Sequence, residues 1–220
     1  MKYKSVFDII GPVMIGPSSS HTAGAARIGR IARSLFGREP KKAVITFYGS
    51  FAKTYKGHGT DVAIVGGILD FDTSDERIIK ALEFAKNDGI VISIKEDEAL
   101  TDHPNTARIH LSDEKGEMEL VGISIGGGKV EIVELNGYKL RLTGVNPALL
   151  VVHQDTFGVI ASVTNALTKH EVNIGYMEVY RQDKGKEALM IIEVDQNLSE
   201  KIVQEVSKLE HVIKVIEIHD

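Results

Sequence analysis

The stretch A-L-L-V-V-H-Q-D-T-F-G-V-I-A-S-V, Ala148 to Val163, decides how the C-terminal part of the chain folds. Ala148 to His153 is a short apolar run, which is typical of a buried strand. From Phe157 and Gly158 onward, apolar residues recur with the 3.6-residue period of an amphipathic helix. The stretch therefore predicts a buried strand followed by a helix.

The rest of the C-terminal part continues this alternation. Further strands are predicted at Val172–Arg181, Ala188–Asp195 and Val212–Ile218, the first two joined by a polar hairpin loop. Asn197, with Glu200 three residues on, resembles a capping box that would start a second helix. The order βαββαβ predicts an antiparallel four-stranded sheet with two helices on one face.

The pattern changes at the turn signal Gly144–Pro147, which places a domain boundary between residues 1–147 and 148–220. The N-terminal part is glycine-rich and predicts a mixed α/β domain, so that the whole chain belongs to the α+β class. A helix is expected from Ser20 through Leu35 with one apolar face. Further elements are expected as strands at 43–48 and 90–95, helices at 61–69 and 75–86, and a β-meander over 106–143 with a hairpin at Asn136-Gly137.

Composition excludes several classes of protein. The 220 residues carry a net charge of -5 and no cysteine. The chain alone can therefore form no disulfide, no cysteine nucleophile and no thiolate-held zinc or iron–sulfur site. A mildly acidic chain also argues against nucleic-acid binding.

Apolar segments predict neither a membrane span nor a signal peptide. Val62 to Leu69 is the longest strongly apolar stretch, far short of the roughly 20 residues of a spanning helix. Near the N-terminus, Asp8 interrupts the apolar segment and Gly11-Pro12 ends it. We expect a cytoplasmic protein without a membrane partner.

The motif G-P-S-S-S-H-T-A-G, Gly16 to Gly24, places three serines, a histidine and a threonine just before a predicted helix. Hydroxyls and free N–H groups at a helix start can bind a carboxylate or phosphate. Serine and threonine are also the preferred helix caps. The residues alone leave both interpretations open.

The motif K-G-H-G-T-D, Lys56 to Asp61, places His58 between two glycines. Histidine can be a general base near neutral pH, and the glycines would allow close approach of a substrate. The alternative is a polar turn capped by Thr60 or Asp61, which the residues alone favour.

Two further motifs are weaker. T-D-H-P-N-T, Thr101 to Thr106, contains His103 and Asn105, which can bind ligands but are also ordinary residues of turns. S-I-G-G-G, Ser124 to Gly128, lacks the Lys-Ser or Lys-Thr of a phosphate loop and favours close backbone approach to a ligand or a hairpin turn. No metal site is expected, because four other histidines lie scattered at His110, His170, His211 and His219.

Taken together, these motifs and the opening S-V-F-D-I-I-G-P, Ser5 to Pro12, resemble the β chain of the iron–sulfur-dependent bacterial L-serine dehydratases. The C-terminal part resembles an ACT domain, a ferredoxin-like βαββαβ module that binds amino acids. The two resemblances cover essentially the whole chain.

The resemblance implies conversion of L-serine to pyruvate and ammonia with a [4Fe–4S] cluster, one iron of which acts as a Lewis acid on the serine hydroxyl. In the two-subunit enzyme a separate α chain carries the cysteines. The absence of cysteine here fits a β chain, which would provide no cofactor ligands and would need the cysteine-bearing α chain as partner.

By the same resemblance, His58 is the expected base for the Cα proton. The substrate carboxylate would be bound, or the cluster pocket lined, by Ser18, Ser19, Ser20, His21 and Thr22. His103 and Asn105 are weaker candidates for the same pocket.

ACT domains usually bind effectors at the first βα loop and the start of the second strand. The matching residues are His153, Asp155, Phe157, Gly158, Asn173 and Ile174. Gly158 would let backbone N–H groups approach a carboxylate, and Asn173 could reach a ligand across a dimer interface. Asp155 would repel a carboxylate and attract an ammonium group, or it could cap the helix. Self-association through the ACT domain is expected, since its sheet has exposed edges.

Two other functions remain as alternatives. A free-standing ACT-type amino-acid sensor would use the N-terminal part as an output module. Phosphate or nucleotide binding through the serine and glycine loops is disfavoured by the mismatch to the phosphate-loop pattern.

Overall fold

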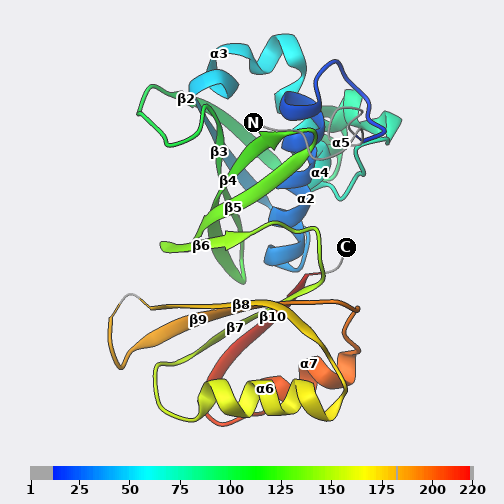
Figure 1. Ribbon diagram of the computed structural model, residues 1–220. Helices are drawn as coiled ribbons and strands as arrows, with labels where there is room; N and C mark the ends of the chain where they lie inside the picture. The colour runs from blue at the N-terminus through cyan, green and yellow to red at the C-terminus, as the bar shows by residue number, and fades with distance from the viewer. Residues whose placement is uncertain (1–11, 182, 219–220) are drawn as a thin grey trace. The chain divides into compact units, whose positions relative to one another are not determined.

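The computed structural model describes residues 12–181 and 183–218 (Figure 1). The opening segment 5–11 and His219 lie outside these residues. The chain forms two compact units, divided between Gly137 and Tyr138. The strand Tyr138–Leu142 continues the sheet of the first unit. We therefore propose to place the domain boundary after Pro147, as expected from the sequence, and describe this strand with the first unit.

The first unit contains a six-stranded sheet and several helices. Its elements are η1 (Ser19–Ala23), α2 (Gly24–Phe36), β1 (Lys42–Tyr48), α3 (Gly49–His58), α4 (Thr60–Ile68), η2 (Glu76–Lys80), α5 (Ala81–Asn87), β2 (Val91–Asp97), β3 (Asn105–Asp113), β4 (Gly116–Gly126), β5 (Lys129–Leu135) and β6 (Tyr138–Leu142). The strand order is β2-β1-β3-β4-β5-β6. β1 and β2 run parallel, whereas β3, β4 and β5 form the antiparallel meander expected from the sequence.

Helix α2 lies on one face of this sheet, and α4 packs against α2 (Figure 1). The apolar face predicted for α2 is buried, namely Ala25, Ile28, Ala32 and Leu35. Helix α4 is buried nearly all round, as expected for an apolar helix in the middle of a core. The two helices approach closely where Gly29 faces the backbone of Ile64 and Gly67 faces that of Ala26.

The second unit confirms the βαββαβ prediction. It contains β7 (Ala148–Gln154), α6 (Val159–Lys169), β8 (Ile174–Arg181), β9 (Glu187–Val194), α7 (Glu200–Ser207) and β10 (Val212–Ile218). The strand order is β10-β7-β9-β8, and every pairing is antiparallel. Both helices cover one face of the sheet (Figure 1) and share one apolar core with it.

Three local predictions differ from the structure. Helix α3 was not expected. The helix expected at 75–86 is divided into the 3₁₀ turn η2 and the short helix α5. The capping box at Asn197 is wrong, because α7 begins at Glu200 and its N-cap is Ser199, which makes no side-chain cap bond. Glu200 is therefore the first helical residue, whereas a capping box needs it at the third.

Within residues 12–181 and 183–218, no helix combines the length and the apolar character needed to cross a bilayer.

The close crossing of α2 and α4 makes a testable prediction. A methyl group at Gly67 would overlap the backbone carbonyl oxygen of Ala26, and neither helix backbone can move without disturbing the core. We expect Gly67→Ala to lower the free energy of unfolding by about 2 kcal/mol or more, measured by chemical denaturation. The matched control is Gly57→Ala, where an added methyl group meets open space, and its effect should stay within about 1 kcal/mol. Equal effects of the two substitutions would contradict the close packing.

Candidate active site

The serine-rich motif forms one irregular turn of π-helix that leads directly into α2. Ser18 is the N-cap of η1, and its Oγ accepts the backbone N–H of His21 at 3.1 Å. The capping interpretation is therefore correct for Ser18. The side chains of His21 and Thr22 instead contact other segments, so capping does not account for the whole motif.

Hydroxyl groups surround the imidazole of His21. Its Nδ1 lies 3.1 Å from Ser20 Oγ and 3.4 Å from Ser18 Oγ, and the two serine oxygens are 3.4 Å apart. Its Nε2 lies 3.0 Å from Ser50 Oγ, on helix α3. The edge of the Phe51 ring closes one side, with ring centroids 5.3 Å apart. Both ring nitrogens of His21 thus have a partner.

His58 lies beside His21, with the two ring centroids 4.8 Å apart. It is the last residue of α3, and its backbone carbonyl accepts the hydroxyl of Thr22 at 3.1 Å. Its Nδ1 is buried and has no hydrogen-bond partner among the residues that the structure describes. A buried imidazole nitrogen without a partner can accept a proton from, or bind, a ligand that enters the site.

The K-G-H-G-T-D motif joins two helices through a single residue. Helix α3 runs up to His58, Gly59 alone turns the chain, and α4 starts at Thr60. Thr60 Oγ1 is buried without a hydrogen-bond partner among the described residues, whereas Asp61 Oδ1 accepts the backbone N–H of Val62 at 2.9 Å and so satisfies one free donor at the start of α4. The position of His58 is therefore fixed by two helices.

The pKa of His21 is lowered from its ordinary value. Burial is the largest cause and the neighbouring imidazole of His58 the second, since both disfavour the charged form. Both effects favour the neutral form of His21.

The H-P-N-T segment positions the start of α3. The carbonyl of Pro104 accepts the backbone N–H of Ser50 at 2.7 Å and that of Phe51 at 3.4 Å, which satisfies two free donors of the helix start. Gly49 has a φ of 53° and lies so close to Pro104 that a side chain there would meet the Pro104 backbone. Only glycine suits this position.

His103 and Asn105 lie in this segment, next to the helix start. His103 Nδ1 accepts the backbone N–H of Asn105 at 3.1 Å, and the Asn105 amide donates to the carbonyl of Ser124 at 3.4 Å. Ser124 lies near the end of β4, and its buried Oγ packs against Gly24 without a hydrogen-bond partner among the described residues. Gly127 and Gly128 form the hairpin turn that joins β4 to β5, and both of them, like Gly126 at the end of β4, have positive φ.

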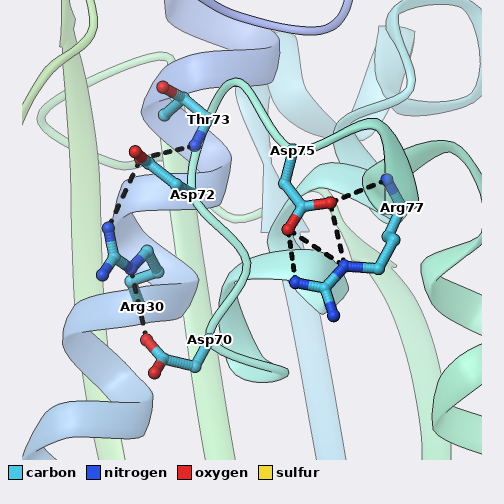
Figure 2. A network of polar contacts seen from close by, with 6 residues as sticks. All are labelled: Arg30, Asp70, Asp72, Thr73, Asp75 and Arg77. Carbon is cyan, nitrogen blue, oxygen red and sulfur yellow. Dashed lines mark hydrogen bonds and ion pairs between the residues drawn. The ribbon is translucent and has the colours of Figure 1, made fainter.

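A second polar network ties down the chain that precedes the serine motif (Figure 2). Arg30 of α2 donates to Asp72 at 3.3 Å, and Asp72 accepts the backbone N–H of Thr73 at 2.7 Å. Thr73 in turn donates its hydroxyl to the carbonyl of Val13 and accepts the N–H of Ile15, both at 2.8 Å. The segment that precedes the serine motif is thereby held against helix α2.

The structure thus brings together four motifs that lie far apart in the sequence. Sequence reasoning missed three contributors, Ser50, Phe51 and the buried hydroxyl of Ser124. Ser124 belongs to the motif S-I-G-G-G, but the interpretation of that motif rested on its glycines and gave Ser124 no role. No motif contains Ser50 or Phe51.

In the second unit, the residues expected at the effector site fall into two groups. His153, Asp155, Phe157 and Gly158 lie at the first βα loop, whereas Asn173 and Ile174 lie at the opposite end of the sheet, beside the last residues of β9. His153 is buried at the end of β7, with Nδ1 bonded to the Gln154 carbonyl at 2.7 Å and Nε2 without a partner. Phe157 is 98% exposed, and Gly158, with φ 87°, is the N-cap of α6. Asn173 donates to Asp195 at 2.5 Å and directly precedes Ile174, the half-buried first residue of β8.

Asp155 has protein partners for its carboxylate. It accepts the backbone N–H of Gly185 at 2.9 Å and the guanidinium of Arg181 at 3.1 Å. These two groups, the first being the larger cause, lower the pKa of Asp155. Asp155 does not cap α6, since that helix has no side-chain cap bond. It instead ties the βα loop to the hairpin loop after β8.

Comparison with known proteins finds two families along the chain. Residues 5–82 match the family of the serine dehydratase beta chain, and residues 149–214 match the AHAS small subunit-like ACT domain. The chain is 66% identical over 220 residues, the full length of both, to the probable L-serine dehydratase beta chain of Bacillus subtilis (strain 168).

Two other relatives are more distant. The chain is 38% identical over 200 residues, 90% of each chain, to the L-serine dehydratase beta chain of Peptoniphilus asaccharolyticus. It is 26% identical over 191 residues to D-3-phosphoglycerate dehydrogenase of Bacillus subtilis (strain 168), covering 87% of this chain and 36% of that enzyme. The resemblance drawn from the motifs is confirmed: the chain belongs to the family of serine dehydratase beta chains and carries an ACT domain.

Proposed function

We propose that this chain is the beta subunit of a two-chain L-serine dehydratase that converts L-serine to pyruvate and ammonia. Full-length similarity to L-serine dehydratase beta chains supports the proposal. The structural observation that carries it is the His21–His58 pair: the two ring centroids are 4.8 Å apart, and Nδ1 of His58 is buried without a hydrogen-bond partner among the described residues. A free-standing sensor is not favoured, because it would leave this pair without a role. The cytoplasmic location expected from the sequence stays a prediction.

The residues of this chain do not fit an iron–sulfur cluster. Such clusters are held mainly by cysteine thiolates, and the chain has none. Within residues 12–181 and 183–218, no three His, Asp or Glu side chains gather closely enough to hold a metal ion. We therefore assign the [4Fe–4S] cluster of the assembled enzyme to a cysteine-bearing alpha chain.

Loss of the Cα proton of L-serine requires a base, and we assign this role to His58 in its neutral form. The free Nδ1 of His58 is available to take the proton. The carbonyl bond to Thr22 and the packing against His21 hold the ring in place, so that little reorganisation is needed.

We propose that Ser18–Thr22 binds the substrate carboxylate. The segment presents hydroxyls and helix-start N–H groups, both of which favour an anion. His103 and Asn105 are proposed to line the same pocket, which their contacts near the start of α3 and at Ser124 support.

The assignment of the base predicts a large loss of turnover. His58→Ala, in the complex with the alpha chain, should lower kcat about 100-fold or more, because no other group replaces the proton acceptor. Pyruvate formation from L-serine under anaerobic conditions is the measurement. His110→Ala is the matched control: His110 lies on β3, pairs with Glu117 at 3.2 Å and should be dispensable. Nearly full turnover of the His58 variant would show that another residue is the base.

The electrostatics of the pair predict how His21 titrates. Its ring should titrate below the ordinary histidine value of about 6.5 in an NMR titration. In His58→Gln the pKa of His21 should rise but stay below that value, because burial is the larger cause. The unfolded chain binds more protons than the folded one between the two pKa values, so this group makes stability fall as the pH drops through that window. Titration of His21 at or above 6.5 would contradict this reading of the site.

We propose that the ACT domain binds an amino acid at the first βα loop. The residues proposed for this are His153, Asp155, Phe157 and Gly158 of the loop. Asn173 and Ile174, at the other end of the same sheet, are proposed to reach the ligand from a second copy across a dimer interface. Gly158 at the start of α6 supports binding of a carboxylate, whereas the bonds of Asp155 to Arg181 and Gly185 must be kept or exchanged when a ligand ammonium binds. Self-association through this domain is proposed as well, since β8 and β10 are the edges of its sheet.

The effector proposal predicts a binding signal in the full chain. Calorimetry with L-serine and other amino acids should detect one that binds. Asn173→Ala should weaken that binding about tenfold, as expected for one lost polar contact. Asn165→Ala, exposed on α6, is the matched control and should bind like the unchanged chain. Binding that survives Asn173→Ala would place the effector elsewhere.

A further inference from the structure

Ser50 is a polar residue that none of the motifs includes, yet its side chain reaches the centre of the site. It is the second residue of α3, and its Oγ lies 3.0 Å from Nε2 of His21, which is 29 residues earlier in the chain. On the other side of the ring, Nδ1 is met by the hydroxyls of Ser20 and Ser18. A continuous series of hydrogen-bonding groups thus crosses the imidazole, in the order Ser18, Ser20, His21 and Ser50.

A neutral imidazole has one nitrogen that donates and one that accepts, so its two partners decide which tautomer is present. The Oγ of Ser18 already accepts the backbone N–H of His21, which leaves its own hydrogen for Ser20. Ser20 then donates to Nδ1, and Nε2–H donates to Ser50. This direction satisfies each group in the run and leaves the hydrogen of Ser50 for a bound ligand.

The backbone of Ser50 is held independently of its hydroxyl. The carbonyl of Pro104 accepts its N–H at 2.7 Å, and its own carbonyl accepts the hydroxyl of Thr54 at 2.7 Å. Removal of Oγ therefore leaves the start of α3 intact. Among the described residues, the one hydrogen bond that it deletes is the bond to His21.

We infer that Ser50 is a positioning residue that fixes His21 as the Nε2–H tautomer and holds its ring, uncharged, against His58. The catalytic part of this inference rests on the proposed function, because it takes His58 as the base. With the ring fixed, His21 cannot turn its own nitrogens toward His58 and compete for the proton. Ser50 thus acts on the base through His21 rather than through substrate.

The direct test is the tautomer of His21 in the full-length chain. In ¹⁵N-histidine-labelled protein, with the signal assigned through His21→Gln, Nε2 should carry the proton in the unchanged chain. In Ser50→Ala the Nε2–H loses its acceptor, and the nitrogen shifts should move toward the Nδ1–H form, which can still donate to Ser20. Ser50→Thr keeps a hydroxyl and should restore the original shifts.

Thr54→Val is the matched control, because it removes a hydroxyl one turn along α3 that bonds only to the helix carbonyl in the described structure. Its His21 shifts should equal those of the unchanged chain. A structural role of Ser50 alone would lower stability without changing the tautomer. Unchanged His21 shifts in Ser50→Ala, or an Nδ1–H form in the unchanged chain, would overturn the inference.

Kinetics in the complex with the alpha chain separate the inference from the proposed function. Ser50→Ala should lower kcat about tenfold, the equivalent of one hydrogen bond, with KM changed less than about twofold. Ser50→Thr should recover most of the rate. If the unchanged complex forms no pyruvate, the proposed function fails, while the NMR result still decides whether Ser50 fixes His21. If the complex is active and Ser50→Ala is as fast as the unchanged enzyme, the inference about the base is wrong.

Discussion

Helix α3 is held at both ends, and the arrangement of the site depends on this constraint. At its start the Pro104 carbonyl accepts the N–H of Ser50, and at its end the Thr22 hydroxyl donates to the carbonyl of His58. The residues between these ends span about two helical turns. The same helix therefore presents a hydroxyl and an imidazole to His21 from different turns, and neither can move without breaking one of the two end contacts.

The second unit and helix α2 could be predicted from the sequence because their apolar spacing is regular. Strands and helices alternate from Ala148 onward with clear changes of period, and each predicted element is present. The apolar face of α2 is equally regular, and it is buried as expected. Amphipathic periodicity reports which face meets a core, so it predicts elements of this kind well.

Helix α3 could not be predicted in this way. Its sequence G-S-F-A-K-T-Y-K-G-H has a glycine at each end region and no repeated apolar stripe, and Phe51 is its one buried residue. That residue packs edge-on against Phe47 of β1, with ring centroids 5.9 Å apart. Tertiary contacts, not local propensity, make this segment helical. The role of Ser50 was not predicted because the helix that contains it was not predicted. The four motifs, distant in the sequence, come together through strand pairing, which no local pattern encodes.

Because α3 is a continuous helix attached at both ends, a small tilt at one end displaces the other. Its ten residues extend about 15 Å, so a tilt of about 4° at the Pro104 end displaces the His58 end by about 1 Å. A displacement of that size changes reaction rates about 100-fold when it misaligns a reacting group. A contact that shifts the loop around Pro104 would therefore move His58, the proposed base, from a distance.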